Sequence, residues 1–110
     1  MLRLSSLVDE VALIRDLEAV AEIPQNKITR RERERLLVRK AVARLPQNPR
    51  LIVFLKFWEG EAMEEIAQTL NISVDEVRVE YITALYYLEK VLKPYVLESS
   101  FFMKEAVGAL

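Results

Sequence analysis

The chain has 110 residues, of which 52% are hydrophobic and 30% are charged, with a formal net charge of −1. This composition fits one ordered globular domain and argues against disorder. The absence of cysteine and histidine excludes disulfides, thiolate metal sites and the commonest general base. Only two glycines and four prolines occur, which favours helices joined by short turns. We therefore expect an all-α protein that is not an enzyme and has no cofactor.

Hydropathy and charge define further limits. No apolar run reaches the roughly 20 residues that a membrane-spanning helix needs, and no signal-peptide pattern occurs at the N-terminus. We expect a cytoplasmic protein with no membrane partner. Residues 27–44 contain eight basic and two acidic residues, whereas residues 59–92 contain eight acidic and two basic ones. A polyanion would be attracted to the first segment and repelled by the second.

Residues 4–22 have the apolar spacing of a helix. Ser6 and Asp9 stand at the spacing of a capping box at its start. The principal apolar stripe comprises Leu7, Val11, Ile14, Leu17 and Ala21, and it is widened by Val8, Leu13 and Val20. This helix is either a core helix or one that binds a partner, and residues 23–26 interrupt the pattern because a proline disfavours helical geometry before it.

A second helix is expected at residues 30–44, with Thr29 and Glu32 as its capping box. One face is apolar, and the rest carries two basic rows: Arg31, Arg35 and Arg39, and then Arg33, Lys40 and Arg44. These rows are either a solvated face whose arginine stems cover apolar neighbours or a basic surface that binds a polyanion.

A third helix is predicted at residues 50–59, with Asn48 as N-cap and Pro49 in the first helical position. Because it is mostly apolar, we expect it to be the central core helix, packed on several sides. Gly60 supplies the left-handed residue that ends it.

A short helix at 62–70, a break at 71–73 and a longer helix at 74–92 form a helix-turn-helix pattern. Asn71 suits the left-handed turn position, and Ser73 with Glu76 is a third capping box. At 100° per residue, the core side of the longer helix comprises Val77, Tyr81, Ala84, Leu85, Leu88 and Leu92. Val79, Ile82 and Tyr86 fall on the opposite side, where neither solvent nor DNA requires an apolar stripe.

Pro94 ends this helix, and we expect the segment that follows to be covered rather than exposed to solvent, because it is apolar. We divide the chain into an N-terminal helix and linker at 1–28, a helix-turn-helix domain at 29–94, and a C-terminal tail at 95–110. The tail is expected to form a short helix that packs on its own domain or on a neighbouring subunit.

Several motifs from residue 45 onward resemble region 4 of bacterial sigma-70-type factors, in particular those of the extracytoplasmic-function type. They are, in order, Leu45-Pro46-Gln47-Asn48-Pro49-Arg50, Phe54-Leu55-Lys56-Phe57-Trp58-Glu59-Gly60, Glu64-Glu65-Ile66-Ala67, Leu70-Asn71-Ile72-Ser73, Val77 and Ala84-Leu85. The resemblance covers residues 35–92 and implies a four-helix domain, here with an extra helix at each end. No segment resembles sigma region 2, so we expect that this is not a complete sigma factor.

The resemblance implies that the second helix of the helix-turn-helix binds the promoter −35 element and that the domain docks on the flap of the RNA polymerase β subunit. Its base-reading end would comprise Asp75, Glu76, Arg78, Val79, Ile82 and Thr83. The family usually has lysine or arginine at several of these positions and where Tyr86 and Tyr87 stand. In this chain only Arg78 is basic, Glu80 replaces a frequent arginine, and Ala62 replaces the usual serine cap.

Two functional hypotheses remain open. In the first, a DNA-binding transcription regulator uses Arg78 to read a base, and its backbone contacts come from Arg30, Arg31, Arg35, Arg39 and Arg50. In the second, DNA readout has been lost and the stripe of Val79, Ile82 and Tyr86 binds protein. The protein partner would be RNA polymerase, a regulator or a second copy, and the homodimer is the simplest expectation.

Overall fold

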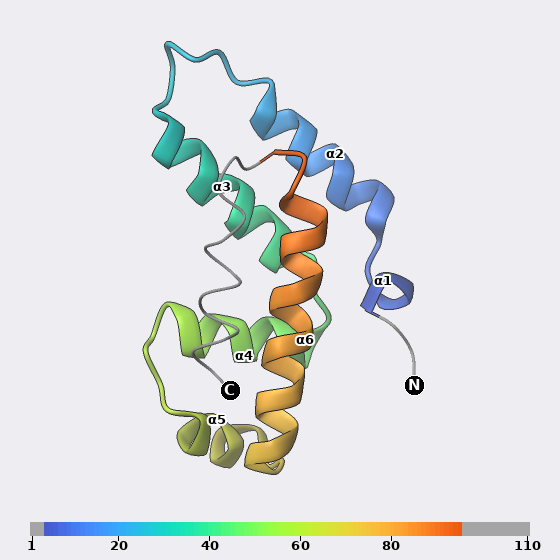
Figure 1. Cartoon of the computed structure of the whole chain (residues 1–110), viewed down its shortest axis with the longest axis vertical. Coiled ribbons are helices and arrows are strands. Elements are labelled where there is room, and N and C mark those ends of the chain that lie inside the picture. The colour runs from blue at the N-terminus through green and yellow to red at the C-terminus, as the bar shows by residue number, and fades with distance from the viewer. Residues whose placement is uncertain (1–3, 96–110) are drawn as a thin grey trace.

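The computed structural model describes residues 4–95, and these form six α-helices with no strand among them. The all-α prediction is therefore confirmed. The tail helix expected after residue 95 lies outside the described residues. Figure 1 shows the six helices, which are α1 (Leu4–Leu7), α2 (Glu10–Ala21), α3 (Arg30–Ala43), α4 (Gln47–Phe57), α5 (Met63–Leu70) and α6 (Val74–Leu92).

Helix α6 is the helix on which most of the others pack. It contacts α1, α3, α4 and α5, with α3 beside its C-terminal half and α5 beside its N-terminal end (Figure 1). The core side predicted for α6 is confirmed, because the following residues are all buried: Val77, Tyr81, Ala84, Leu85, Leu88 and Leu92. One long apolar stripe thus holds together the two ends of the molecule.

The single helix predicted at residues 4–22 is wrong, because the chain breaks between α1 and α2. Asp9 does not complete a capping box with Ser6. Its side chain accepts a hydrogen bond of 3.1 Å from the backbone N–H of Ala12, and it is the N-cap of α2. An aspartate is a strong N-cap because its carboxylate satisfies an amide that has no helical acceptor.

The face of α2 that enters the core also differs from the principal stripe predicted for it. Leu13, Leu17 and Val20 are buried, whereas Val11 is 69% exposed and Ile14 is 48% exposed. Helix α2 packs along α3, and its buried residues join the same hydrophobic cluster as those of α6. Since both stripes of α2 are apolar, only the position of α3 selects the buried one.

Two arginines, Arg33 of α3 and Arg44 at its C-cap, hold α2 in place. Arg33 donates hydrogen bonds to the carbonyl oxygens of Val20 at 2.7 Å, Ala21 at 3.1 Å and Ile23 at 2.6 Å. It thereby satisfies acceptors at the C-terminal end of α2 that have no partner within that helix. Arg44 pairs with Asp16 of α2 at 2.8 Å, which lowers the pKa of the Asp16 carboxyl. The row of Arg33, Lys40 and Arg44 thus includes two residues with structural roles.

Helix α4 differs from its prediction at its start. It begins at Gln47, so Pro49 is its third residue, which is tolerated because the first amides of a helix have no acceptor within it. As predicted, the helix packs on several sides, against α3, α5 and α6, but one side stays open. Ile52 and Val53 are buried, but Phe54 is 44% exposed and Trp58, its C-cap, is half-buried. Its aromatic side chains therefore border a surface.

Candidate nucleic-acid and protein interfaces

The helix-turn-helix of α5 and α6 forms as its turn residues predict. Asn71 adopts a left-handed conformation with φ of 56°, and the N–H of Ile72 donates to the carbonyl of Ala67 at 3.1 Å. The hydroxyl oxygen of Ser73 accepts a hydrogen bond of 3.0 Å from the N–H of Glu76. The prediction that Ser73 caps the second helix is confirmed, and α6 starts directly after the turn.

The first turns of α6, which would read DNA in this fold, are acidic and contain a single arginine. Arg78 donates to the carboxylate of Asp75, three residues earlier, at 3.1 Å. Asp75 and Glu76 are both exposed. Carboxylates here are stabilised by the positive end of the helix dipole, but they repel the phosphates of an approaching duplex. The one basic residue at this end is therefore already engaged.

Glu80 adds a partly buried carboxyl to the same part of α6. Its Oε2 is shielded from solvent and has no hydrogen-bond partner among the described residues. Burial raises the pKa of Glu80, and the nearby carboxylate of Glu76 raises it further. A cationic group that reached this carboxyl would relieve both the lost solvation and the repulsion.

The apolar positions on the outer side of α6 are open to different degrees. Val79 is 60% exposed and Tyr86 is 47% exposed, whereas Ile82 is half-buried. Thr83, between them, is exposed. We use the term α6 surface for Val79, Ile82 and Tyr86. Large apolar side chains exposed together on one helix are typical of a surface that another molecule covers.

Beside this surface lies a groove of about 890 Å³ between α1, the start of α4 and α6. Its walls include Leu4 and Leu7 of α1, Pro49 of α4, and Val79 and Glu80 of α6. The groove combines apolar walls with carboxylates, which suits a partner that has both apolar and basic side chains.

Tyr87 does not belong to the outer side of α6. Its side chain is 8% exposed, and its hydroxyl donates to Oε2 of Glu10 at 2.8 Å. Burial raises the pKa of Tyr87, and the hydrogen bond to Glu10 raises it further. At the position where the related domains usually have a basic residue, this chain thus has a tyrosine that attaches the N-terminal helices to α6.

The basic residues of α3 divide into paired and unpaired groups. Arg30 pairs with Glu34 at 3.3 Å, and Arg33 and Arg44 contact α2 as described above. Within residues 4–95, no hydrogen bond or ion pair involves the side chains of the remaining predicted arginines, which are Arg31, Arg35, Arg39 and Arg50. These four cations are available to an external anion.

The predicted DNA-contacting residues do not form one continuous site. Arg39 and Arg50 come together at a second groove, between α3 and α4. Helix α3, which contains Arg31, Arg35 and Arg39, lies beside the C-terminal half of α6 (Figure 1). Asp75 and Arg78 belong to the first turns of α6, at its N-terminal end. The acidic end and the basic helix are therefore separate surfaces.

Sequence reasoning missed the second groove because it assigned Phe54 and Trp58 to the core. Both line this groove together with Arg39 and Arg50. The available signal was the four-residue spacing of Arg50, Phe54 and Trp58, which puts all three on one side of a helix.

Comparison with known proteins supports this fold assignment. The family model for sigma-70, region 4 matches residues 35–81. No curated protein and no solved structure matches the chain. The chain thus contains a sigma region 4-like domain, formed by the second part of α3, by α4 and α5, and by the start of α6.

This assignment carries a general functional implication. Sigma region 4 domains are non-enzymatic, transcription-related domains that bind DNA and RNA polymerase in general. None of the helices among residues 4–95 is both long enough and apolar enough to cross a membrane.

Proposed function

We propose that this protein acts in transcription regulation by binding RNA polymerase through the α6 surface, and that its reading of promoter DNA is weakened or lost. The observation that carries the proposal is the ion pair between Arg78 and Asp75 at the DNA-reading end of α6. Of the two ligands common to region 4 domains, the acidic end of α6 disfavours the polyanion.

The electrostatic argument concerns phosphate contacts. Neutralised phosphates supply essentially all non-specific affinity for DNA and often a large share of specific affinity. In the described part of α6, the first turns contain Asp75, Glu76 and Glu80 against Arg78 alone. The carboxylate of Asp75, which accepts a hydrogen bond from Nη1 of Arg78, also offsets part of the positive charge that Arg78 would offer to a phosphate. Docking in the major groove by this helix is therefore opposed by charge.

The chemistry of the α6 surface supports a protein ligand. Val79 and Tyr86 are exposed, and aromatic residues are enriched in the centres of protein interfaces. The neighbouring groove contains the carboxyl of Glu80, which would be complemented by a basic side chain of the partner.

The test compares RNA polymerase and promoter DNA as ligands of the full chain. Val79→Asp should weaken binding of labelled protein to core RNA polymerase at least tenfold, because it buries a charge in an apolar interface. Val11→Asp is the matched control, since Val11 is an exposed valine on α2. Binding of a promoter-like duplex, followed by anisotropy at about 50 and 200 mM salt, should be weak and unaffected by Arg78→Ala.

Two results would reject this proposal. The first is sequence-specific duplex binding that Arg78→Ala abolishes. The second is wild-type protein that shows no affinity for polymerase. The homodimer expected from the sequence is measured in the same samples by sedimentation, where Ile82→Asp should reduce self-association if α6 forms the dimer interface.

The unpaired arginines support a second candidate, a regulator that binds promoter DNA. In this candidate the DNA backbone is contacted by Arg31, Arg35 and Arg39, and also by Arg30 and Arg50. Arg78 reads a base. Arg35→Gln should then reduce the salt slope of duplex binding by about 0.9. A slope that does not change would count against this candidate.

A further inference from the structure

A second surface, distinct from α6, combines arginines with aromatic rings. It is the groove of about 400 Å³ between α3 and α4, lined by Arg39, Arg50, Phe54 and Trp58 with Val42 and Leu51 between them. We call it the arginine–aromatic groove. Among the described residues that line it there is no carboxylate, so its charge is positive.

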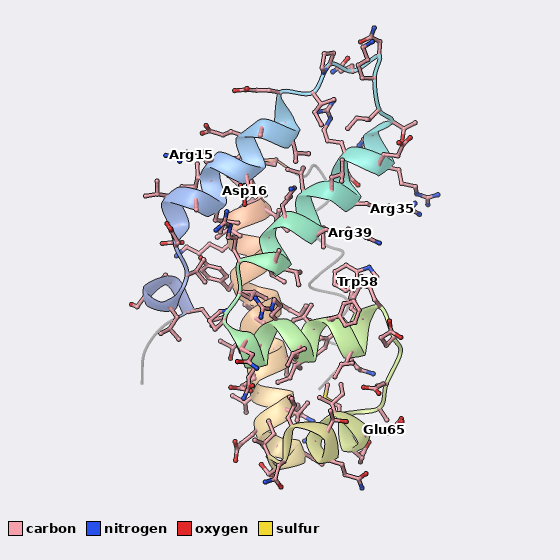
Figure 2. All side chains as sticks on the ribbon, turned by 180° about the vertical axis from the view of Figure 1, so that it is seen from behind. Arg15, Asp16, Arg35, Arg39, Trp58 and Glu65 are labelled. Carbon is pink, nitrogen blue, oxygen red and sulfur yellow. The ribbon has the colours of Figure 1, made fainter. Side chains whose placement is uncertain are left out.

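The arginines of this groove are accessible to solvent, and further arginines on α3 extend the basic row beyond it. Arg39 and Arg50 are exposed, and the guanidinium of neither makes an ion pair or hydrogen bond with another described residue. Arg31 and Arg35 precede Arg39 at four-residue intervals, about 6 Å apart along the helix axis. Figure 2 shows Arg35, Arg39 and Trp58 on the same side of the molecule. A row of unpaired cations thus leads into the groove.

The aromatic rings form a cluster that is partly exposed. Phe54 is 44% exposed, and its ring centroid lies 6.0 Å from that of Trp58, with the rings tilted by 33°. Phe57 contacts Trp58 edge-on, with the ring centroids 5.1 Å apart. The exposed faces of these rings do not contribute to core packing, but they can stack on a planar ligand.

We propose that the arginine–aromatic groove binds single-stranded nucleic acid. Bases stack on Phe54 and Trp58, while Arg39 and Arg50 bind the flanking phosphates and Arg35 extends the track. Proteins that bind single strands without sequence preference combine these two elements, a positive groove and aromatic platforms. In a duplex, neighbouring bases cover each base face, so the rings would have no stacking partner.

An acidic peptide is the competing ligand, because it would also satisfy arginines beside apolar rings. The repeated spacing of Arg31, Arg35 and Arg39 favours a strand, in which negative charge recurs at every nucleotide. The proposal concerns a different surface from the α6 surface. It can therefore fail or hold independently of the proposed binding of RNA polymerase.

Trp58 is the only tryptophan of the chain, so its fluorescence reports on the groove directly. Titration of the full chain with an oligo(dT) of about 12 nucleotides at low salt should quench this fluorescence as bases stack. The affinity should fall with salt at a slope near −2, corresponding to about three neutralised phosphates. The same titration with a duplex of equal length should leave the fluorescence nearly unchanged.

Variants separate the two elements of the groove. Arg39→Gln should weaken binding and reduce the salt slope by about 0.7. The matched control is Arg15→Gln, because Arg15 is an exposed arginine on the opposite side of the molecule (Figure 2). Phe54→Ala should weaken binding on the order of tenfold at every salt concentration while the slope is kept. Circular dichroism checks that each variant is folded, and Arg39→Gln alone tests the proposal if Phe54→Ala does not fold.

The proposal is overturned by any of four results. The first is that oligo(dT) does not quench the fluorescence of Trp58 at low salt, and the second is that inorganic polyphosphate quenches it equally. The third is that Arg15→Gln and Arg39→Gln weaken oligo(dT) binding equally. The fourth is that an acidic amphipathic peptide quenches the fluorescence and the oligonucleotide does not. The last result would identify the groove as a protein-binding site.

Discussion

The hydroxyl of Tyr87 donates a hydrogen bond of 2.8 Å to the carboxylate of Glu10, a residue 77 positions away in the chain, and so joins two helices. Tyr87 lies in α6, and Glu10 is the first residue of α2. Together with Arg33 at the other end of α2, this contact explains how the N-terminal helices attach to the sigma region 4-like domain. It also explains why a tyrosine at this position is not part of the surface of α6.

Tyr87→Phe should destabilise the protein by about 1 kcal/mol, because it removes the donor to a partly buried carboxylate and keeps the ring. The measurement is the midpoint of urea unfolding, followed by circular dichroism. Tyr86→Phe is the control, because Tyr86 is 47% exposed, and it should leave the midpoint unchanged. Equal effects of the two substitutions would show that the contact with Glu10 does not contribute.

Arg33→Ala should cost about 2 kcal/mol, since it leaves three carbonyl oxygens at the end of α2 without their charged donor. Arg33→Lys should recover little of this loss, because an ammonium lacks the planar fork that reaches several acceptors at once. Hydrogen exchange should accelerate in α2 before the rest of the protein. Arg35→Ala, at an unpaired arginine, is the control. Wild-type stability of Arg33→Lys would contradict the proposed role of the guanidinium.

Glu80→Gln should stabilise the protein at neutral pH, and the benefit should disappear in acid. Burial and Glu76 raise the pKa of Glu80 above its ordinary value of 4.5, so the folded state binds the proton more tightly than the unfolded state. The stability that protonation of Glu80 contributes to the folded protein is therefore fully present below pH 4.5. It is lost as the pH rises through the raised pKa of Glu80. Thermal unfolding of both proteins between pH 3 and 8, on the order of one scan per pH unit, checks this sign. If the two proteins differed in stability by the same amount at every pH, a raised pKa of Glu80 would be refuted.

Gly60→Ala should destabilise the protein by about 1 kcal/mol through backbone strain alone. The glycine has φ of +68°, and an added Cβ would meet no atom within 4 Å, so no steric clash contributes. Gly60→Asn should cost less, because asparagine tolerates the left-handed conformation better than alanine does. Denaturant unfolding ranks the three proteins, and the reverse order of alanine and asparagine would exclude strain as the cause.

Much of the local structure could be predicted from the sequence because its causes are local. Thr29 and Ser73 cap their helices with their own side chains, and Asn71 and Gly60 adopt positive φ. These interactions involve residues at most three positions apart, so composition and spacing suffice to recognise them. The buried side of α6 was equally predictable, since one long stripe satisfies the helical period.

Prediction failed in the N-terminal helices. We expected Asp9 to complete a capping box with Ser6, but it is itself the N-cap of α2. In α2 both the stripe through Val11 and the stripe through Leu13 are apolar, and packing on α3 buries Leu13. Burial is decided by a partner helix that lies at a distance in the sequence, and periodicity does not identify that partner.

The same division applies to function. The sequence by itself determined the helix-turn-helix, the acidic start of α6 and the presence of a basic α3, because each depends on residues within one helix or turn. Only the tertiary structure decided which arginines stay unpaired and that Arg39 of α3 meets Arg50 and Trp58 at one groove. The physical reason is that a side chain's charge belongs to its sequence, whereas its partners are set by how helices pack against one another.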